Sequence, residues 1–503
     1  MLSGSADEWK RVHIISPLVR GWIALLAVIF FGGRDWFESF LIGGGERFRE
    51  GPVGNLPLAI AIVVGVVVVV AGVFFLSWWF TRFQVTEEHV RVNSGVLFRQ
   101  HRQARLDRVQ AIDVVQPFLA RVFGLAELKF DVADAGESAV RLAFLKLDDA
   151  QKLRATILAR AAGVSLGPGR EQEIPEAPER EVLALTPARV IGAAVLSGNS
   201  IGAVLALIGI GVFAVVLETG ALFAAFVPIL IAVAGGYWST LSTGFNFRAA
   251  ISPDGIRIRY GLLDTRTQTV PPGRVQAVGV IQSPLWRLKG WYKVTVNVAG
   301  YGASPSGEAQ ARATLLPVGT LEEVLQVIAL VLPDPGTDRP VEVFTAGLAG
   351  RDSDAGFITT PRRARIIAPF AWRRNGFAVT RTALLARTGA WWRELSVVPH
   401  ERTQSLALHQ GPLARRFRVA DLILHTTPGP VSPRVHQIAE DEAWRLFDEQ
   451  SIRAAEARRR SGPEQWMRPV PADDRDEQTG GPLDTAVMPD PPSYTEGQAR
   501  HEL

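Results

Sequence analysis

The segment Arg108-Val109-Gln110-Ala111-Ile112-Asp113-Val114-Val115-Gln116 decides the fold of this chain, because the chain contains it three times. It returns in altered form at residues 274–282 and 402–410, and the alignment extends without a gap over residues 86–131, 252–297 and 380–425. The copies are offset by 166 and then 128 residues. A gapless repeat of this length indicates that three copies of one structural unit make up much of the 503-residue chain.

Six positions are identical in all three copies and define the framework of the repeat. They are Gly95/Gly261/Gly389, Arg108/Arg274/Arg402, Gln110/Gln276/Gln404, Gln116/Gln282/Gln410, Leu119/Leu285/Leu413 and Arg121/Arg287/Arg415. The shared glycine follows a short alternating segment, where a hairpin turn with a positive φ angle explains it. The shared Arg-x-Gln and the distal glutamine have two interpretations: a ligand-binding face on one strand, or a hydrogen-bond network that supports the sheet. Retention in three copies favours the network, because a binding site needs only one good copy.

Each copy has the pattern of several short strands followed by one helix. The alternation in Val90-Arg91-Val92 and Ile256-Arg257-Ile258 predicts half-buried strands. Acidic pairs such as Asp148-Asp149 and Glu322-Glu323 begin the last segment of a copy, where negative charge complements a helix dipole. We therefore expect each repeat, of about 80 residues, to be a small β-sandwich or partly open barrel closed by a C-terminal helix.

Hydrophobic residues make up 47% of the chain and are clustered, which predicts membrane-spanning helices. Residues 56–80, 190–217 and 219–247 contain no charged side chain, and residues 21–33 form a weaker apolar segment. At 1.5 Å per residue the longer segments can cross a hydrocarbon layer of about 30 Å. We expect four transmembrane helices in two hairpins, at residues 17–80 and 186–241. A secretory signal peptide is the alternative for the first segment, but no cleavage motif follows it.

The basic residues next to these segments predict the orientation. Lys10, Arg11 and Arg20 precede the first apolar segment, and Arg82 and Arg91 follow the second. Because Lys and Arg gather on the cytoplasmic side of membrane proteins, we expect a multi-pass protein of the cell (inner) membrane with both termini in the cytoplasm.

Apolar helices followed by a repeat with Arg-x-Gln in its middle resemble the bacterial pleckstrin-homology-like (YdbS/YdbT) membrane proteins. The segments that carry this resemblance are Leu106-Asp107-Arg108-Val109-Gln110 with Gln116 and Gly124, Gly273-Arg274-Val275-Gln276 with Gln282 and Gly290, and Glu401-Arg402-Thr403-Gln404 with Gln410. The resemblance implies a pleckstrin-homology-like (PH-like) fold for each repeat and no established reaction. The expected fold class is membrane α + β: two transmembrane hairpins with three PH-like domains, each closed by a C-terminal helix. The third repeat departs from the pattern, because no hairpin precedes it and Arg418 replaces the glycine of the other copies.

The expected domain boundaries follow from the repeats and from composition. They are a cytoplasmic N-terminus (1–16), hairpin 1 (17–80), PH-like domain 1 (83–160), a linker (161–185), hairpin 2 (186–241), PH-like domain 2 (247–332), a linker (333–371), PH-like domain 3 (372–450) and a disordered tail (451–503).

The sequence contains no recognisable catalytic constellation. Cysteine is absent, and neither a phosphate-binding Gly loop nor a Gly-x-Ser-x-Gly elbow is present. The eight histidines are scattered, so we expect no catalytic, metal or cofactor site. The net charge of +4 is too small to indicate a nucleic-acid partner.

A basic, Trp-containing stretch at residues 362–418 predicts contact with anionic lipid headgroups. The candidate contact residues are Arg373, Arg374, Trp391, Trp392, Arg415 and Arg416. The alternative is a solvated basic face or a contact with the other repeats.

These observations predict a non-enzymatic membrane protein whose three cytoplasmic modules bind a protein partner or anionic lipid, as a scaffold or envelope accessory. The alternative is a component of a transporter or channel, which the uncharged apolar segments disfavour because transport pathways usually contain ionisable residues. A membrane enzyme is a third and weaker hypothesis.

Overall fold

The computed structural model describes residues 9–13, 15–16, 19, 56–86, 89–95, 99–105, 109–132, 140–161, 180–217, 221–252, 255–299 and 311–460. The chain divides into two units, residues 1–466 and 467–503, and the second lies outside the described residues. Most of the predicted tail therefore also lies outside them.

The first repeat consists of two antiparallel three-stranded halves and a closing helix. The N-terminal half contains β2 (Arg82–Val85), β3 (His89–Ser94) and β4 (Gln100–Arg105), with the short β1 (Lys10–Arg11) beside β2. The C-terminal half contains β5 (Val109–Gln116), the short helix α3 (Phe118–Val122), β6 (Leu125–Val132) and β7 (Val140–Lys146). Helix α4 (Leu147–Ala161) closes the repeat and begins with the acidic pair Asp148-Asp149, as the sequence predicts.

The second repeat has the same order of elements. Its strands are β9 (Arg248–Ser252), β10 (Gly255–Tyr260), β11 (Thr265–Val270), β12 (Val275–Gln282), β13 (Tyr292–Val298) and β14 (Thr314–Gly319), with the 3-10 turn η4 (Leu285–Lys289) after β12. Its closing helix, α9 (Leu321–Val331), begins with a capping box in which Thr320 and Glu323 satisfy each other's backbone N–H groups.

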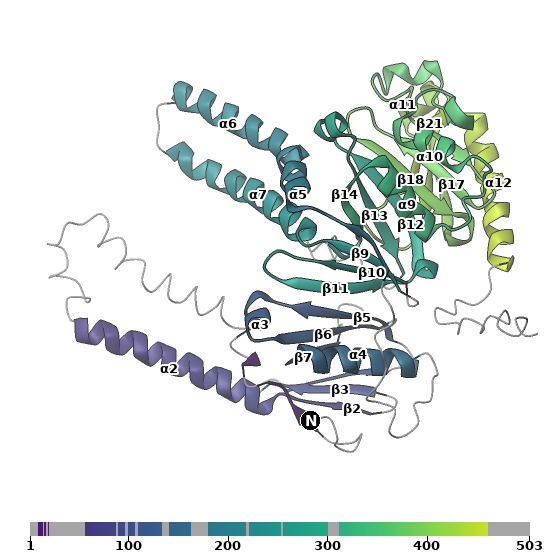
Figure 1. Ribbon diagram of the computed structural model, residues 1–503. Coiled ribbons are helices and arrows are strands. Elements are labelled where there is room, and N and C mark those ends of the chain that lie inside the picture. The colour runs from purple at the N-terminus through teal and green to yellow at the C-terminus, as the bar shows by residue number, and fades with distance from the viewer. Residues whose placement is uncertain are drawn as a thin grey trace, which may run out of the picture. The chain divides into compact units, whose positions relative to one another are not determined.

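The third repeat repeats the order once more. Its elements are β16 (Gly376–Val379), β17 (Ala383–Thr388), β18 (Arg393–Pro399), β19 (Ser405–His409), α11 (Pro412–Arg416), β20 (Val419–His425), β21 (Arg434–Ala439) and α12 (Glu440–Arg460). Helix α12, yellow in Figure 1, continues ten residues past the expected end of this domain at residue 450.

The halves of successive repeats join edge to edge into larger sheets. One seven-stranded sheet has the order β7-β6-β5-β11-β10-β9-β8, so the C-terminal half of repeat 1 continues into the N-terminal half of repeat 2. Here β8 (Arg180–Ala184) forms the outer edge. A second sheet, β14-β13-β12-β18-β17-β16-β15, joins repeat 2 to repeat 3 in the same way, with β15 (Ile358–Thr359) at its edge. The repeats therefore share sheets rather than forming three separate domains.

The core of the second repeat continues into the third. One cluster of buried side chains includes Ile258, Val294 and Leu316 from repeat 2 together with Leu385 and Leu395 from repeat 3, all at most 1% exposed. Apolar side chains of α9 cover this cluster, as expected for a helix that closes a sandwich.

Apolar helices precede the first two repeats. They are α2 (Leu56–Phe80) before repeat 1, and α5 (Pro187–Val195), α6 (Gly198–Leu217) and α7 (Ala221–Gly244) before repeat 2. Helices α6 and α7 lie side by side (Figure 1). The Trp286 ring N–H donates to the Ala193 carbonyl (2.9 Å), which attaches α5 to the β-rich part of repeat 2.

The predicted fold class with two transmembrane hairpins is wrong. Within the described residues, no single helix is long and apolar enough to cross a membrane. The uncharged segment at 190–217 is not one continuous helix, because the chain breaks between α5 and α6. In the part of the chain that the structure describes, one bent pair, formed by α5 and residues 198–212 with a 43° bend, has sufficient length and apolar character. The predicted first span, in residues 17–33, lies almost entirely outside the described residues.

Candidate functional site

The framework residues stabilise the repeats themselves. In each repeat the distal glutamine donates its side-chain N–H to the backbone carbonyl nine residues later: Gln116 to Leu125 (3.1 Å), Gln282 to Trp291 (3.2 Å) and Gln410 to Val419 (3.2 Å). Each bond ties the end of one strand to the start of the next across the short helical turn. The distal glutamine thus has the same structural contact three times, which fits the network interpretation.

The glycine framework also has the predicted conformation. Gly95, Gly261 and Gly389 have φ angles of 103°, 138° and 81°, which non-glycine residues rarely adopt. Gly124 and Gly290 have φ angles of 66° and 61°, and Arg418, at the same place in repeat 3, has a φ of 48°. The third repeat therefore retains the turn without its glycine.

The Arg-x-Gln motif is less uniform than its sequence. Gln276 is buried and donates to the carbonyl of Arg274 (3.3 Å), whereas Gln404 is exposed. Arg402 lies 3.9 Å from Glu401. Arg108 and the side chain of Gln110 lie outside the described residues. Among the copies that the structure describes, those of repeats 2 and 3, these residues therefore form no common binding face.

The last framework arginine differs between repeats. Arg121 and Arg415 are exposed. Arg287 instead donates to the carbonyls of Ala390 (2.5 Å) and Trp391 in repeat 3. Arg287 thus holds the β17–β18 hairpin tip that carries the two predicted lipid-contact tryptophans.

Trp391 and Trp392 belong to an exposed apolar surface that the sequence showed only in part. Trp391 is 59% exposed, and its ring centroid lies 6.4 Å from that of Phe370, which is 73% exposed. Trp392 is 53% exposed and packs near Gly198, the first residue of α6. We call Phe370, Trp391 and Trp392 the aromatic surface. Phe370 was missed because it follows an Arg-rich stretch with no strand or helix periodicity.

The four arginines predicted to contact lipid differ in their exposure. Arg415 and Arg416 are exposed on α11, and Arg373 is exposed but forms an ion pair with Asp352 (2.5 Å).

The assignment of Arg374 to lipid contact is wrong, because this residue is only 3% exposed. Its guanidinium donates to the carbonyls of Gly347 (3.0 Å), Leu348 (3.0 Å) and Gly350 (2.9 Å), at the C-terminal end of α10 (Pro340–Ala349). A cation at this position satisfies helix-end carbonyls and complements the helix dipole.

Arg387, which the sequence analysis did not single out, completes this arrangement. It is fully buried, donates to the carbonyls of Arg374 (2.9 Å), Ala346 (2.9 Å) and Asp352, and lies 4.2 Å from the Phe357 ring centroid. Burial lowers the pKa of Arg374 to about 9 and that of Arg387 to about 10, so both remain charged at neutral pH. No pattern in the sequence distinguishes these two arginines from the solvated ones around them.

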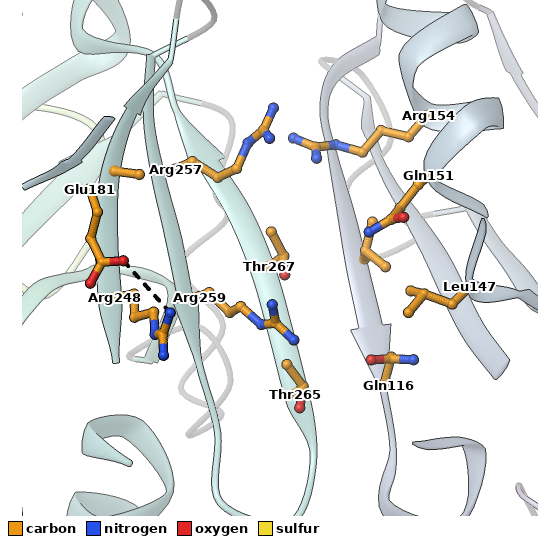
Figure 2. Close-up of a pocket in the computed structure, with 12 residues that line it drawn as sticks. Gln116, Leu147, Gln151, Arg154, Glu181, Arg248, Arg257, Arg259, Thr265 and Thr267 are labelled. Atoms are coloured by element: carbon orange, nitrogen blue, oxygen red, sulfur yellow. Dashed lines mark ion pairs between the residues drawn. The ribbon is translucent and has the colours of Figure 1, made fainter. Parts of the chain in front are cut away.

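A cavity of about 320 Å³ lies at the junction of repeats 1 and 2 (Figure 2). Its walls come from β5 and α4 of repeat 1 and from β8 to β11. The polar lining residues are Gln116, Gln151, Arg154, Glu181, Arg248, Arg257, Arg259, Thr265 and Thr267.

The cavity has a strongly positive lining. Four arginines face one glutamate, a formal charge of +4 − 1 = +3. Arg154 and Arg257 are only 6% and 7% exposed, and Figure 2 shows their guanidinium groups pointing toward each other from α4 and β10. Arg154 also donates to the hydroxyl of Thr269 (2.6 Å), and Arg248 lies 3.6 Å from Glu181. The charge and donor geometry favour anions such as phosphate or carboxylate.

Among the described residues, no group of three or more His, Asp or Glu side chains is placed to hold a metal ion.

Comparisons with known proteins agree with the repeated architecture. Residues 35–161, 192–331 and 343–453 each match the bacterial PH domain family, and the chain belongs to this family. The chain is similar to the UPF0699 transmembrane protein YdbT of Bacillus subtilis (strain 168), with 21% identity over 330 residues, or 59% of this chain. The aligned region spans 64% of that relative, slightly less than two thirds of its length. No solved structure matches the chain.

Proposed function

We propose that this chain is a non-enzymatic, membrane-associated scaffold whose joined PH-type repeats bind the cytoplasmic face of the inner membrane through the aromatic surface of repeat 3. The observation that carries this proposal is the ring contact of Phe370 with Trp391 (6.4 Å), beside Trp392 in the chain, with all three side chains more than half exposed. Aromatic side chains at such positions partition into the interface between lipid and water. Exposed clusters of large apolar side chains mark sites of interaction with proteins or membranes.

Two further observations favour a lipid surface. Basic residues Arg415 and Arg416 are exposed in the same repeat, and the cytoplasmic leaflet carries a negative surface potential. The similar Bacillus protein is described as a transmembrane protein, which supports association of this chain with a membrane.

Flotation of the full chain with vesicles tests this proposal. We expect stronger binding to vesicles that contain phosphatidylglycerol than to pure phosphatidylcholine vesicles. The variant Phe370→Ser/Trp391→Ser should reduce binding about tenfold or more, since each aromatic side chain loses on the order of 1 kcal/mol or more of transfer free energy.

The matched control is Trp444→Ser, because Trp444 is also exposed (56%) but lies on α12. Equal binding by the double variant and the control would contradict docking through the aromatic surface. Solute movement across sealed vesicles by the purified chain would instead favour a transporter.

The cavity at the junction of repeats 1 and 2 favours a second function, the binding of a phosphate or carboxylate group. Titration of the full chain with inorganic phosphate should release heat, and Arg257→Gln should weaken the binding. Arg339→Gln, an exposed arginine on another element, serves as the control. Equal phosphate binding by both variants would exclude this function for the cavity.

A further inference from the structure

The two internal junctions use the same pair of strand positions in the same register. At the first junction Gln116 pairs with Thr265, Val115 with Arg266 and Val114 with Thr267. At the second, Gln282 pairs with Arg393 and Ile281 with Glu394. When residues are superposed by the repeat offsets of 166 and 128, the two sets of pairs coincide. The fourth strand of one repeat (β5 or β12) therefore pairs with the third strand of the next repeat (β11 or β18) in the same register.

This rule leaves two complementary edges at the ends of the array. In repeat 1, β4 occupies the position of β11 and β18, but among the described strands it pairs only with β3. In repeat 3, β19 occupies the position of β5 and β12, but within the described part of the chain it pairs only with β20.

Burial shows the same difference between joined and terminal edges. Strand β12 is almost completely buried and β18 is buried along most of its length. By contrast, five of the six residues of β4 are exposed, and no residue of β19 is fully buried. Exposed strand edges are templates for pairing with another chain unless they are blocked.

We propose that β19 of one copy of this chain pairs with β4 of a second copy, in the register of the internal junctions. This register places Gln410 opposite Arg99, His409 opposite Gln100, Leu408 opposite His101 and Ala407 opposite Arg102. The contact is head-to-tail and repeats from copy to copy, so it builds a row of molecules rather than a dimer.

The side chains at these edges fit the proposed pairing. The bond from Gln410 to Val419 already places the end of β19 as Gln116 and Gln282 place the ends of β5 and β12. Arg102 of β4 would lie opposite the neutral Ala407, and Arg99, just before β4, opposite the neutral Gln410. Like charges directly opposite would oppose such pairing, and none is created. The basic side chains of β4 instead disfavour pairing of β4 with itself.

Cysteine crosslinking tests the contact and its register, because the chain has no native cysteine. Two differently tagged full-length variants, His409→Cys and Gln100→Cys, are mixed and oxidised. We expect a disulfide-linked pair with at least tenfold higher yield than from the mixture of His409→Cys and Arg99→Cys, which is shifted by one residue. That shift places the two side chains on opposite faces of the sheet. Equal yields would overturn the proposed register.

Sedimentation of the unmodified chain provides the second measurement, with a matched charge exchange. We expect mass to increase with concentration beyond that of a dimer. Ala407→Lys should abolish this increase by placing a lysine opposite Arg102, and mixing it with the Arg102→Glu variant should restore pairs. A chain that remains monomeric at every concentration, or a lysine variant that the exchange does not rescue, would overturn the proposal.

Discussion

The two internal junctions share one register but differ in strength. Five residue pairs join β12 to β18, whereas three join β5 to β11. At the β12–β18 junction β12 is almost completely buried, whereas the β5–β11 junction borders the positively charged cavity. Backbone pairing therefore sets how the repeats are arranged, while the side chains around each junction determine how tightly they are held.

Side-chain contacts across the two junctions also differ. Asn297, on β13 and 1% exposed, donates to Thr426, Thr427 and Val431 of repeat 3 and accepts from the Val431 N–H (2.9 Å). Across the junction of repeats 1 and 2, the corresponding contacts include the ion pair of Asp113 with Arg312 (3.5 Å) and the bond from Arg154 to Thr269. One amide thus anchors a complete loop at the stronger junction.

The largest expected effect is at Asn297. Asn297→Ala should lower the free energy of unfolding by about 3 kcal/mol, because it leaves buried donors and acceptors of residues 426–431 without partners. Chemical denaturation measures the loss. Gln404→Ala, which alters an exposed residue of repeat 3, is the control. A loss no larger than that of the control would mean that the amide does not hold the two repeats together.

A smaller loss is expected at the weaker junction. Asp113→Ala should lower the free energy of unfolding by about 1–2 kcal/mol, because Arg312 loses its ion pair with Asp113. The loss is limited because the Arg312 side chain is 11% exposed and can be hydrated. Amide hydrogen exchange should accelerate in β5 and β11 and remain unchanged in β12 and β18. Equal acceleration at both junctions would show that they are not independent.

The turn between the fourth and fifth strands of each repeat offers a comparison of backbone conformation. A Cβ at Gly290 would meet no atom within 4 Å, so Gly290→Ala should cost about 1 kcal/mol through its positive φ alone. Arg418→Gly should stabilise the chain by less than about 1 kcal/mol, since relief of strain is partly offset by greater freedom of the unfolded chain. Thermal unfolding of both variants checks whether the first lowers and the second raises the unfolding temperature.

The smallest expected effect is a pH dependence confined to the third repeat. His400 is buried, where its ring contacts the Thr380 carbonyl (3.0 Å) and Gln450 (3.0 Å), with Arg453 and Glu401 nearby. Burial lowers the pKa of His400, so the unfolded chain binds a proton more readily than the folded one. The neutral His400 therefore contributes its full stabilisation above about pH 6.5, the ordinary pKa of histidine, and this contribution is lost as the pH falls below that value. His400→Gln should flatten the dependence of the unfolding midpoint between pH 7 and 5, and an unchanged slope would assign the dependence to other groups.

Much of each repeat could be predicted from the sequence, because its local constraints recur. The glycines at 95, 261 and 389 predict their turns, and the repeated distal glutamine indicates a structural contact. The joining of repeats could not be predicted, since pairing of β5 with β11 depends on backbone groups that every residue carries. The burial of Arg374 could not be predicted for a related reason. Its partners are backbone carbonyls at the end of α10, and a backbone carbonyl is present whatever the residue type.

The prediction of two transmembrane hairpins was wrong for a different reason. Uncharged length indicated one span at 190–217, but Leu196 and Ser197 interrupt the helix and α5 packs against Trp286 and Trp291 of repeat 2. Apolar length alone cannot distinguish a segment that contacts lipid from one that covers a sheet.

The C-terminal half-sheets of repeats 1 and 2 each continue into the N-terminal half-sheet of the following repeat. Paired cysteines at the two junctions test this arrangement most directly. Val115→Cys/Arg266→Cys and Ile281→Cys/Glu394→Cys, each made in the full chain, place cysteines at directly paired positions. We predict that mild oxidation forms an intramolecular disulfide in both variants, and that Val115→Cys/Thr267→Cys, shifted by one residue, forms little or none. Absence of both disulfides in the folded chain would contradict the shared sheets.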